Sequence, residues 1–591
     1  MRIVRWRGAP YLLAALITAA VALWFLQPWG MAAGDVFSGG EDIVALQTNI
    51  TEAAQTGPFG TNPHIAYPVG ENLWSFPQSG MAILIGGWLL SGVLGIGSGA
   101  TILWLMMLTL VATACATLFL FRAVIGDRQR VLAATLAAAV GLSPFFVYKI
   151  GHLNVATIFA VPLVLGLLLR ARDRSVRWWV LAAVATAVAV AISPVWWGIV
   201  LLLVLATVGV GVLLQRSWQR VLAVAVTGAG VAVGVGVQVL LFRSARVPGA
   251  SFGRGLWGAN TFGGKFADLL LSSPLLDRLL SPSAWGRIAR GASVELKPIG
   301  IVCALAFVAL VLLLIKVTPA FVRLDNSDRD GSPRVDTTFL TVMSVVVVLF
   351  FVVGGLGNAQ ASVGALLGIA SPARTFSRMS IIIAMLGLAW FLLYFNRWRE
   401  RTRLSGRSGQ VVTAVVVAAV IVVSIADLSA VPRPPTAASS AMAESGAIEF
   451  LRANTTPCPV AQLPQDGAPI PRPIGGKGPT TEARAEFNEQ FYYRGYYPYL
   501  LATDYFWSIG SYHEGATTAL NAIGTTLTQA GSEKLREAGF CAILYDKTLA
   551  ARPGAKDLEG VLVAGMPTPD FVSPRYDVYL LENRPADATA R

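Results

Sequence analysis

The chain has 591 residues, of which 55% are hydrophobic and 13% are charged, and its mean hydropathy is +0.61. Soluble domains carry about 25% charged residues, so this composition excludes a single soluble globule. The high hydrophobicity also excludes an intrinsically disordered chain. The formal net charge of +13 invites a nucleic-acid interpretation, which the distribution of the basic residues argues against.

Eleven apolar segments are long enough, or nearly long enough, to cross a bilayer, and none of them contains a charged residue. The sequence therefore predicts an all-α polytopic membrane protein with about 11 transmembrane helices. The segments are 10–28, 101–121, 131–148, 153–169, 178–194, 195–214, 221–242, 299–315, 338–356, 379–395 and 410–426.

The basic residues gather in alternate loops. With the N-terminus inside, the inner segments hold 21 of the 46 Lys and Arg residues. The first outer loop, 29–80, has five acidic residues and no Lys or Arg. Cytoplasmic loops are the ones enriched in Lys and Arg, and this map requires that the apolar segment 81–97 lies flat on the outer surface. We therefore expect an interfacial segment at 81–97, a C-terminus outside the cell and no binding of nucleic acid.

The composition changes near residue 429. A membrane part with its outer loop covers 1–428, a linker rich in Pro, Ala and Ser covers 429–439, and 440–591 has the composition of a soluble domain. Helices are expected at 447–454 and 531–538, and strands at 458–463, 540–545 and 576–581, which together suggest a small α/β domain. Cys458 and Cys541 fall at two of these strands, and an oxidising outer compartment permits a disulfide between them.

An aromatic cluster occupies 491–499 and 505–507 in this domain. We expect it to pack in the core or in an interface. Contact with the membrane or with a sugar is the alternative.

Carboxylates of the first outer loop are the candidate catalytic groups. Asp35, Glu41 and Asp42 lie close to the expected membrane surface, where a carboxylate can act as a general base or bind a divalent cation. Asp35 and Asp42 are the candidate ligands for Mg²⁺ or Mn²⁺. The alternative for Asp42 is that it caps a predicted helix at 43–54, and for Glu41 that it is solvated.

Cations at the outer ends of the spans are candidates for binding phosphate. Lys149 and His152 lie in a short outer turn, and Arg374 and Arg378 are four residues apart, so they share one face of a helix. Paired guanidinium groups suit phosphate. Anchoring to lipid headgroups explains Lys149 and the arginines equally well, and His152 can be structural.

These features resemble the GT-C superfamily of polyprenyl-phosphate-dependent membrane glycosyltransferases, in particular its bacterial YfhO-like branch. The resemblance covers the membrane part loosely. It is carried by Gly34-Asp35, the helix after Glu41-Asp42, the 67–70 stretch Tyr-Pro-Val-Gly, the flat segment 81–97, Gly151-His152 with the later Pro162, and the region 374–378. An Asp-x-Asp motif is missing from the loop.

The resemblance implies a sugar transfer from a polyprenyl-phosphate donor to a glycan, lipid or protein acceptor of the cell envelope. Asp35 would be the base, with Asp42 or Glu41 as runner-up, and Lys149, His152, Arg374 and Arg378 would hold the donor phosphate. His64 and Glu71 are loop candidates for contact with the acceptor. The expected location is the bacterial cytoplasmic membrane, and membrane lipids are expected partners.

Two other functions stay open at this point. A lipid or polysaccharide transporter or flippase would need charged or polar groups inside the spans, and the eleven spans carry no charge. A non-catalytic envelope-assembly protein would use the outer domain to bind polymer.

Overall fold

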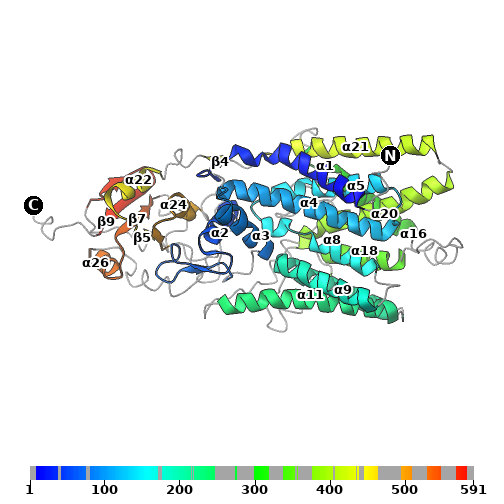
Figure 1. Ribbon diagram of the computed structural model, residues 1–591, viewed down its shortest axis with the longest axis horizontal. Helices are drawn as coiled ribbons and strands as arrows, with labels where there is room; N and C mark the ends of the chain where they lie inside the picture. Colours follow the sequence, from blue (N-terminus) through cyan, green and yellow to red (C-terminus); the bar gives the residue numbers. More distant parts are fainter. Residues whose placement is uncertain are drawn as a thin grey trace, which may run out of the picture.

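The computed structural model describes 8–37, 42–74, 80–170, 176–214, 216, 218–245, 273–275, 299–317, 337–352, 356, 376–402, 406–433, 436–437, 445–463, 494–508, 529–547 and 568–581. It has two parts (Figure 1), a helical bundle and a smaller domain beyond one end of the bundle, which contains the C-terminal strands.

Helices form at all eleven apolar segments predicted from the sequence. Among the described residues, eight helical stretches are long and apolar enough to cross a membrane, and α9, α16 and α18 are shorter. The polytopic membrane fold is therefore confirmed. The helices are α1 (Ala9–Leu26), α4 (Ser98–Ile125), α5 (Arg130–Gly141), α6 (Pro144–Tyr148), α7 (Leu153–Ala156), α8 (Ala160–Arg170), α9 (Val176–Ile192), α10 (Val195–Leu214), α11 (Trp218–Ala245), α16 (Ile301–Val317), α18 (Thr337–Phe351), α20 (Ser380–Arg401) and α21 (Arg407–Ser429).

Two of the predicted spans are interrupted close to the end of the bundle that the first outer loop covers. Proline cannot donate the hydrogen bond that a helix interior needs, and it is tolerated in the first turn. Pro144 accordingly begins α6, where the Ser143 hydroxyl caps the helix by accepting from the Phe145 N–H. The second interruption separates α7 from α8, and Lys149 and His152 lie between the two breaks.

The first outer loop covers the end of the bundle nearest the C-terminal domain (Figure 1). Its helix α2 (Asp42–Thr56) extends the predicted helix by one residue at its start and two at its end. The strands β2 (Thr61–Asn62) and β3 (Glu71–Asn72) form a hairpin. The apolar segment after the loop forms α3 (Met81–Gly87), which continues as a π-helix, η3 (Trp88–Val93). This segment packs on α2 and is separate from the eleven predicted spans.

The C-terminal domain is built on a five-stranded sheet with strand order β6-β5-β7-β9-β8. Strand β5 runs parallel to β6 and β7, and β9 runs antiparallel to β7 and β8. The expected α/β character is present, whereas β6, β8 and α24 were not predicted. The elements are α22 (Ser445–Asn454), β5 (Pro459–Leu463), η7 (Arg494–Tyr496), α24 (Tyr497–Leu501), β6 (Phe506–Trp507), α26 (Gln529–Glu537), β7 (Ala542–Asp546), β8 (Phe571–Val572) and β9 (Tyr576–Leu580).

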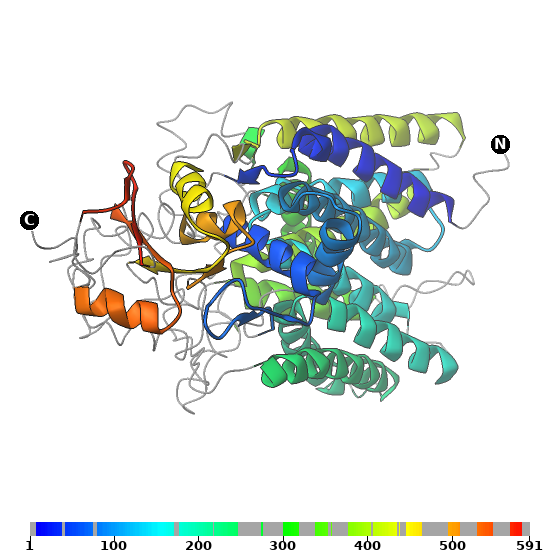
Figure 2. The same ribbon diagram turned by 60° about the vertical axis from the view of Figure 1, so that its left-hand side comes forward.

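Helices cover both faces of this sheet (Figure 2). Side chains alternate along a strand, so Val460 packs in the cluster with α22 and α24, and Ala461 packs in the cluster with α26. Cys458 and Cys541 form a disulfide, with Cα atoms 6.1 Å apart, at the beginning of β5 and β7.

The first outer loop adds a strand-like segment to the edge of this sheet. The Trp507 N–H donates to His64 O and the Tyr67 N–H donates to Trp507 O, each at 2.9 Å. Ile65 packs in one core cluster of the domain and Tyr67 in the other. The open edge of β6 is therefore covered by a segment more than 400 residues away in sequence, and the loop and the C-terminal domain form one joint.

Candidate functional site

Asp35 lies in a tight turn between the first membrane helix and strand β1 (Val36–Phe37). Its carboxylate Oδ2 accepts from the Ala32 N–H at 2.8 Å, and its own N–H donates to Ala32 O at 3.1 Å. Among the described residues the carboxylate makes no other hydrogen bond and no ion pair. The side chain is partly exposed, so it can receive a proton from a hydroxyl that approaches it.

Two glycines let this turn lie against the beginning of α4. A Cβ on Gly97 would lie 2.7 Å from Ala33 Cα, and one on Gly99 would lie 3.2 Å from Asp35 O. The backbone of Asp35 is therefore beside the N-terminus of a long membrane helix, where the helix dipole favours negative charge.

Lys149 and His152 occupy the turn between α6 and α7, as the sequence placed them. The Lys149 side chain is 2% exposed, which rules out a lysine that extends freely into water. His152 precedes the first residue of α7 and is partly buried. Both residues interact with other groups of the chain.

A pair of tryptophans connects α7, the helix that follows this turn, with Arg378. The Trp197 indole donates to Val155 O in α7 at 3.0 Å, and its ring contacts that of Trp196 at 4.4 Å between centroids. The Arg378 guanidinium lies over the Trp196 ring, 5.7 Å from its centroid, a cation–π distance. Neither tryptophan was predicted from the sequence as a site residue, although two adjacent aromatic residues at the end of a predicted span are typical of the membrane interface.

Three buried hydroxyls lie close in sequence to Trp196 or to Arg378. The Oγ atoms of Ser193, Ser377 and Ser380 are buried and have no hydrogen-bond partner among the described residues. Buried polar groups are nearly always hydrogen-bonded. Hydroxyl groups can donate hydrogen bonds to an anionic group such as a phosphate.

The tryptophan pair and the outer loop lie at the same end of the bundle. Gly80 directly precedes α3, and a Cβ on it would lie 2.9 Å from the backbone nitrogen of Pro194. The helix α3 packs on α2, and Gln47 of α2 donates to Asp35 O at 3.0 Å. A continuous set of contacts thus connects Asp35 with the segment that carries Trp196.

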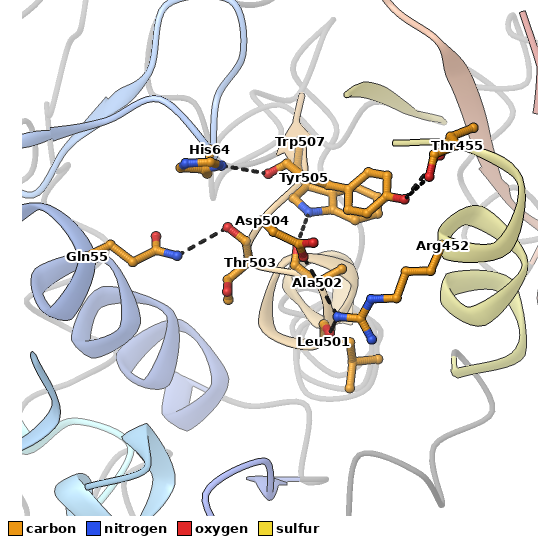
Figure 3. A network of polar contacts seen from close by, with 10 residues as sticks. All are labelled: Gln55, His64, Arg452, Thr455, Leu501, Ala502, Thr503, Asp504, Tyr505 and Trp507. Carbon is orange, nitrogen blue, oxygen red and sulfur yellow. Dashed lines mark hydrogen bonds and ion pairs between the residues drawn. The ribbon is translucent and has the colours of Figure 1, made fainter. Parts of the chain in front are cut away.

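His64 and Glu71 belong to the joint with the C-terminal domain. The His64 Nδ1 atom is 3.2 Å from Tyr505 O, and its ring stacks on Phe506 at 4.5 Å. Figure 3 shows this contact beside the bond from Gln55 Nε2 to Thr503 O, 3.2 Å. Contact of His64 and Glu71 with an acceptor stays a prediction.

Two buried carboxyl groups face one another in this joint. Glu52 of α2 is 2% exposed and Glu71 of β3 is 7% exposed. Burial, followed by repulsion from Glu71, raises the pKa of Glu52 well above its usual value. Burial also raises the pKa of Tyr499, and Glu52 adds to this effect. Glu52 is therefore protonated at pH values where an ordinary glutamate is ionised.

Three of the predicted site residues lie wholly or partly outside the described part of the chain. Glu41 and Arg374 lie outside the described residues. Asp42 is the first residue of α2, and its side chain also lies outside the description. No group of three or more His, Cys, Asp or Glu suited to a metal is found in the described part of the chain, and the Mg²⁺ or Mn²⁺ expectation stays a prediction.

Comparison with known proteins finds a likeness to solved structures alone: no family model and no curated protein matches the chain. The Archaeoglobus fulgidus oligosaccharyltransferase, solved with Zn and sulfate, is 12% identical with a TM-score of 0.45, over 94% of this chain and 70% of that one. The mycobacterial arabinofuranosyltransferase AftD is 15% identical with a TM-score of 0.47, over 98% of this chain and 42% of that one.

A third solved structure, ArnT of Cupriavidus metallidurans bound to undecaprenyl phosphate, is 14% identical with a TM-score of 0.37, over 98% of both chains. Likenesses this distant carry no argument about activity or substrate, which has to come from the residues of this chain.

Proposed function

We propose that the protein is a membrane glycosyltransferase that moves a sugar from a polyprenyl-phosphate donor to an envelope acceptor on the extracytoplasmic side. The observation that carries the proposal is the arrangement at one end of the bundle. A partly exposed carboxylate, Asp35, lies there with a basic, aromatic and hydroxyl-rich segment around Arg378 and Trp196. The YfhO-like branch is part of this proposal.

The chemistry needs a base and a way to stabilise the leaving group. An acceptor hydroxyl oxygen attacks the anomeric carbon, and the bond from that carbon to the phosphate oxygen breaks through an oxocarbenium-like transition state. The acceptor proton passes to Asp35, and the electron pair leaves with the polyprenyl phosphate. Arg378, with Lys149 and His152, would stabilise the charge on that phosphate. The phosphate is already a good leaving group, so a general acid is not required.

Purified full-length protein in proteoliposomes tests the proposal. Undecaprenyl phosphate carrying radiolabelled arabinofuranose, glucose or mannose would serve as donors, with envelope glycolipid extract as acceptor. We expect release of undecaprenyl phosphate and transfer of label from at least one donor, without movement of intact donor across the bilayer. Movement of intact donor without transfer would instead support a flippase, and turnover of none of the donors would contradict the proposal.

Asp35→Asn tests the role of the base. General-base catalysis contributes about 10²- to 10⁴-fold, so we expect a loss of that size with the fold intact. Asp504→Asn, at an exposed aspartate of the C-terminal domain, is the matched control. Repeating the assay with EDTA and then with added Mg²⁺ or Mn²⁺ tests the metal expectation separately.

A further inference from the structure

The side chain of Gln47 brackets the backbone around Asp35. Gln47 lies on α2 and is 1% exposed. Its Oε1 atom accepts from the Phe37 N–H at 3.1 Å, and its Nε2 atom donates to Asp35 O at 3.0 Å and to Ser98 Oγ at 3.1 Å. One amide group thus ties the residues 35 and 37 to α2 and to the first residue of α4.

Tyr497 of the C-terminal domain contacts the same short strand from the other side. Its hydroxyl donates to Phe37 O at 2.9 Å, and its side chain is 2% exposed. Both backbone polar groups of Phe37 are therefore bound by buried side chains from different parts of the fold. Strand β1 also pairs with β4 (Thr436–Ala437), which follows the last membrane helix.

These contacts act on the backbone and leave the carboxylate of Asp35 available. That carboxylate is bound within its own turn, by Ala32 N–H, whereas Gln47 and Tyr497 hold the peptide groups beside it. Such an arrangement fixes the position of the Asp35 backbone without neutralising the charge of its carboxylate. Misplacement of a catalytic group by about 1 Å can cost about 100-fold in rate, so the position of this strand bears directly on turnover.

We propose that Gln47 and Tyr497 are positioning residues for Asp35, and that through Tyr497 the C-terminal domain takes part in the transfer reaction. The inference rests on the proposed function, in which Asp35 is the base. Docking of the C-terminal domain then does more than stabilise the protein: it completes the geometry of a site that lies on the membrane part.

The test compares two tyrosines of one helix. Tyr497→Phe removes the hydroxyl bonded to Phe37 O. Tyr499→Phe, also in α24, removes a hydroxyl that bonds to Gln55 and Asn62 in the same joint but not to β1. With the proteoliposome assay, we expect Tyr497→Phe to lower kcat by 10- to 100-fold with the KM for the donor changed less than twofold. We expect Tyr499→Phe to keep kcat within threefold.

A double variant shows whether Tyr497 acts through Asp35. If it does, Asp35→Asn with Tyr497→Phe has the same residual single-turnover rate as Asp35→Asn alone, because the group being positioned is gone. A further 10-fold loss in the double variant would overturn the inference. Equal losses of kcat in Tyr497→Phe and Tyr499→Phe would overturn it too, because they would indicate general docking.

Hydrogen exchange provides a readout that does not depend on turnover. We expect Gln47→Met, a change of similar size that removes the amide, to speed exchange of the Phe37 amide at least 10-fold in the full-length protein. Unchanged exchange would overturn the inference whatever the activity. Faster exchange together with full activity of Asp35→Asn would show that the strand is held but that Asp35 is not the base, which locates the failure in the proposed function.

Discussion

The joint at the outer end and the helical bundle are held together by different means. In the joint, side chains and backbone groups from the first outer loop and the C-terminal domain exchange hydrogen bonds, as between Tyr497 and Phe37 O or between Trp507 and His64 O. In the bundle, helices pack through small residues, as where Gly387 of α20 lies against Ala306 of α16. Polar contacts are directional, so the joint can fix the position of Asp35 with a precision that apolar packing alone does not provide.

The largest loss of stability is expected in the C-terminal domain, when its buried ion pair is removed. Arg575 and Asp546 form a buried ion pair, with side chains 8% and 5% exposed and nitrogen–oxygen distances of 2.8 and 2.9 Å. Arg575→Met would leave Asp546 buried without its cation, at a cost of about 3–5 kcal/mol. Hydrogen exchange of the β7 amides measures this cost in the full-length protein.

The matched control for that change is Arg452→Met. Arg452 and Asp504 are about half exposed and 3.8 Å apart (Figure 3), so the loss should stay below about 1 kcal/mol. Equal losses in the two variants would contradict the assignment of Arg575 to the core of the domain.

Reduction of the disulfide should destabilise the C-terminal domain and leave the helical bundle unaffected. The bond between Cys458 and Cys541 spans 83 residues, and removing a native disulfide of this kind costs about 2–5 kcal/mol. We expect faster exchange of the β5 and β7 amides after reduction, with the amides of α4 unaffected. A parallel loss of protection in α4 would show that the bundle depends on the outer domain for its own stability.

A larger side chain at a tightly packed glycine should destabilise the helical bundle and leave the joint unaffected. A Cβ on Gly387 would lie 2.3 Å from Ala306 O, whereas one on Gly228 of α11 would have no heavy atom within 4 Å. Gly387→Val should therefore lower stability by about 1–3 kcal/mol relative to Gly228→Val, measured as the thermal midpoint in detergent. Identical midpoints would mean that α16 and α20 are not in close contact.

The smallest expected effect concerns pH and the joint. Glu52 faces Glu71 of the hairpin and Tyr499 of α24, and α3 and η3 contribute no charged residue. The pKa of Glu52 is raised in the folded protein, so the folded state binds a proton that the unfolded state has already released. Stability should therefore fall as the pH rises from the ordinary glutamate pKa toward the raised one.

Glu52→Gln should remove most of this decline, because glutamine keeps the shape and stays neutral. Glu449→Gln, at an exposed position of α22, is the control and should retain it. The thermal midpoints of the wild type and the two variants, measured between about pH 5 and about pH 9, show how steeply the stability of each protein declines. If the stability of Glu52→Gln fell with pH as steeply as that of the wild type, the pH dependence would come from other groups.

The sequence predicted the bundle well because the information is local. Each membrane helix follows from an uninterrupted apolar segment, and the two breaks lie just before Pro144 and Pro162. The helices α22 and α26 and the three longer strands of the C-terminal domain were likewise predicted from their own composition. The two-residue strands β6 and β8 are too short to leave a periodic pattern.

The joint could not be predicted, because its partners are far apart in sequence. Tyr497 and Phe37 are 460 residues apart, and Gln55 and Tyr499 are 444 apart. Nothing in the local sequence of Gln47 distinguishes it from an ordinary polar residue of an amphipathic helix. For the same reason the sequence located Asp35, Lys149, His152 and Arg378 close to the ends of predicted spans, but not the tryptophan pair that connects α7 with Arg378.

The central claim is that donor phosphate and base meet at the end of the bundle that faces the C-terminal domain. The most direct measurement is electron cryo-microscopy of the full-length protein in nanodiscs with undecaprenyl phosphate. We expect phosphate density beside Arg378 and the Trp196 ring, on the side of the bundle where Asp35 lies. Phosphate density at the opposite end, near Glu400 and Arg401 at the end of α20, would contradict it.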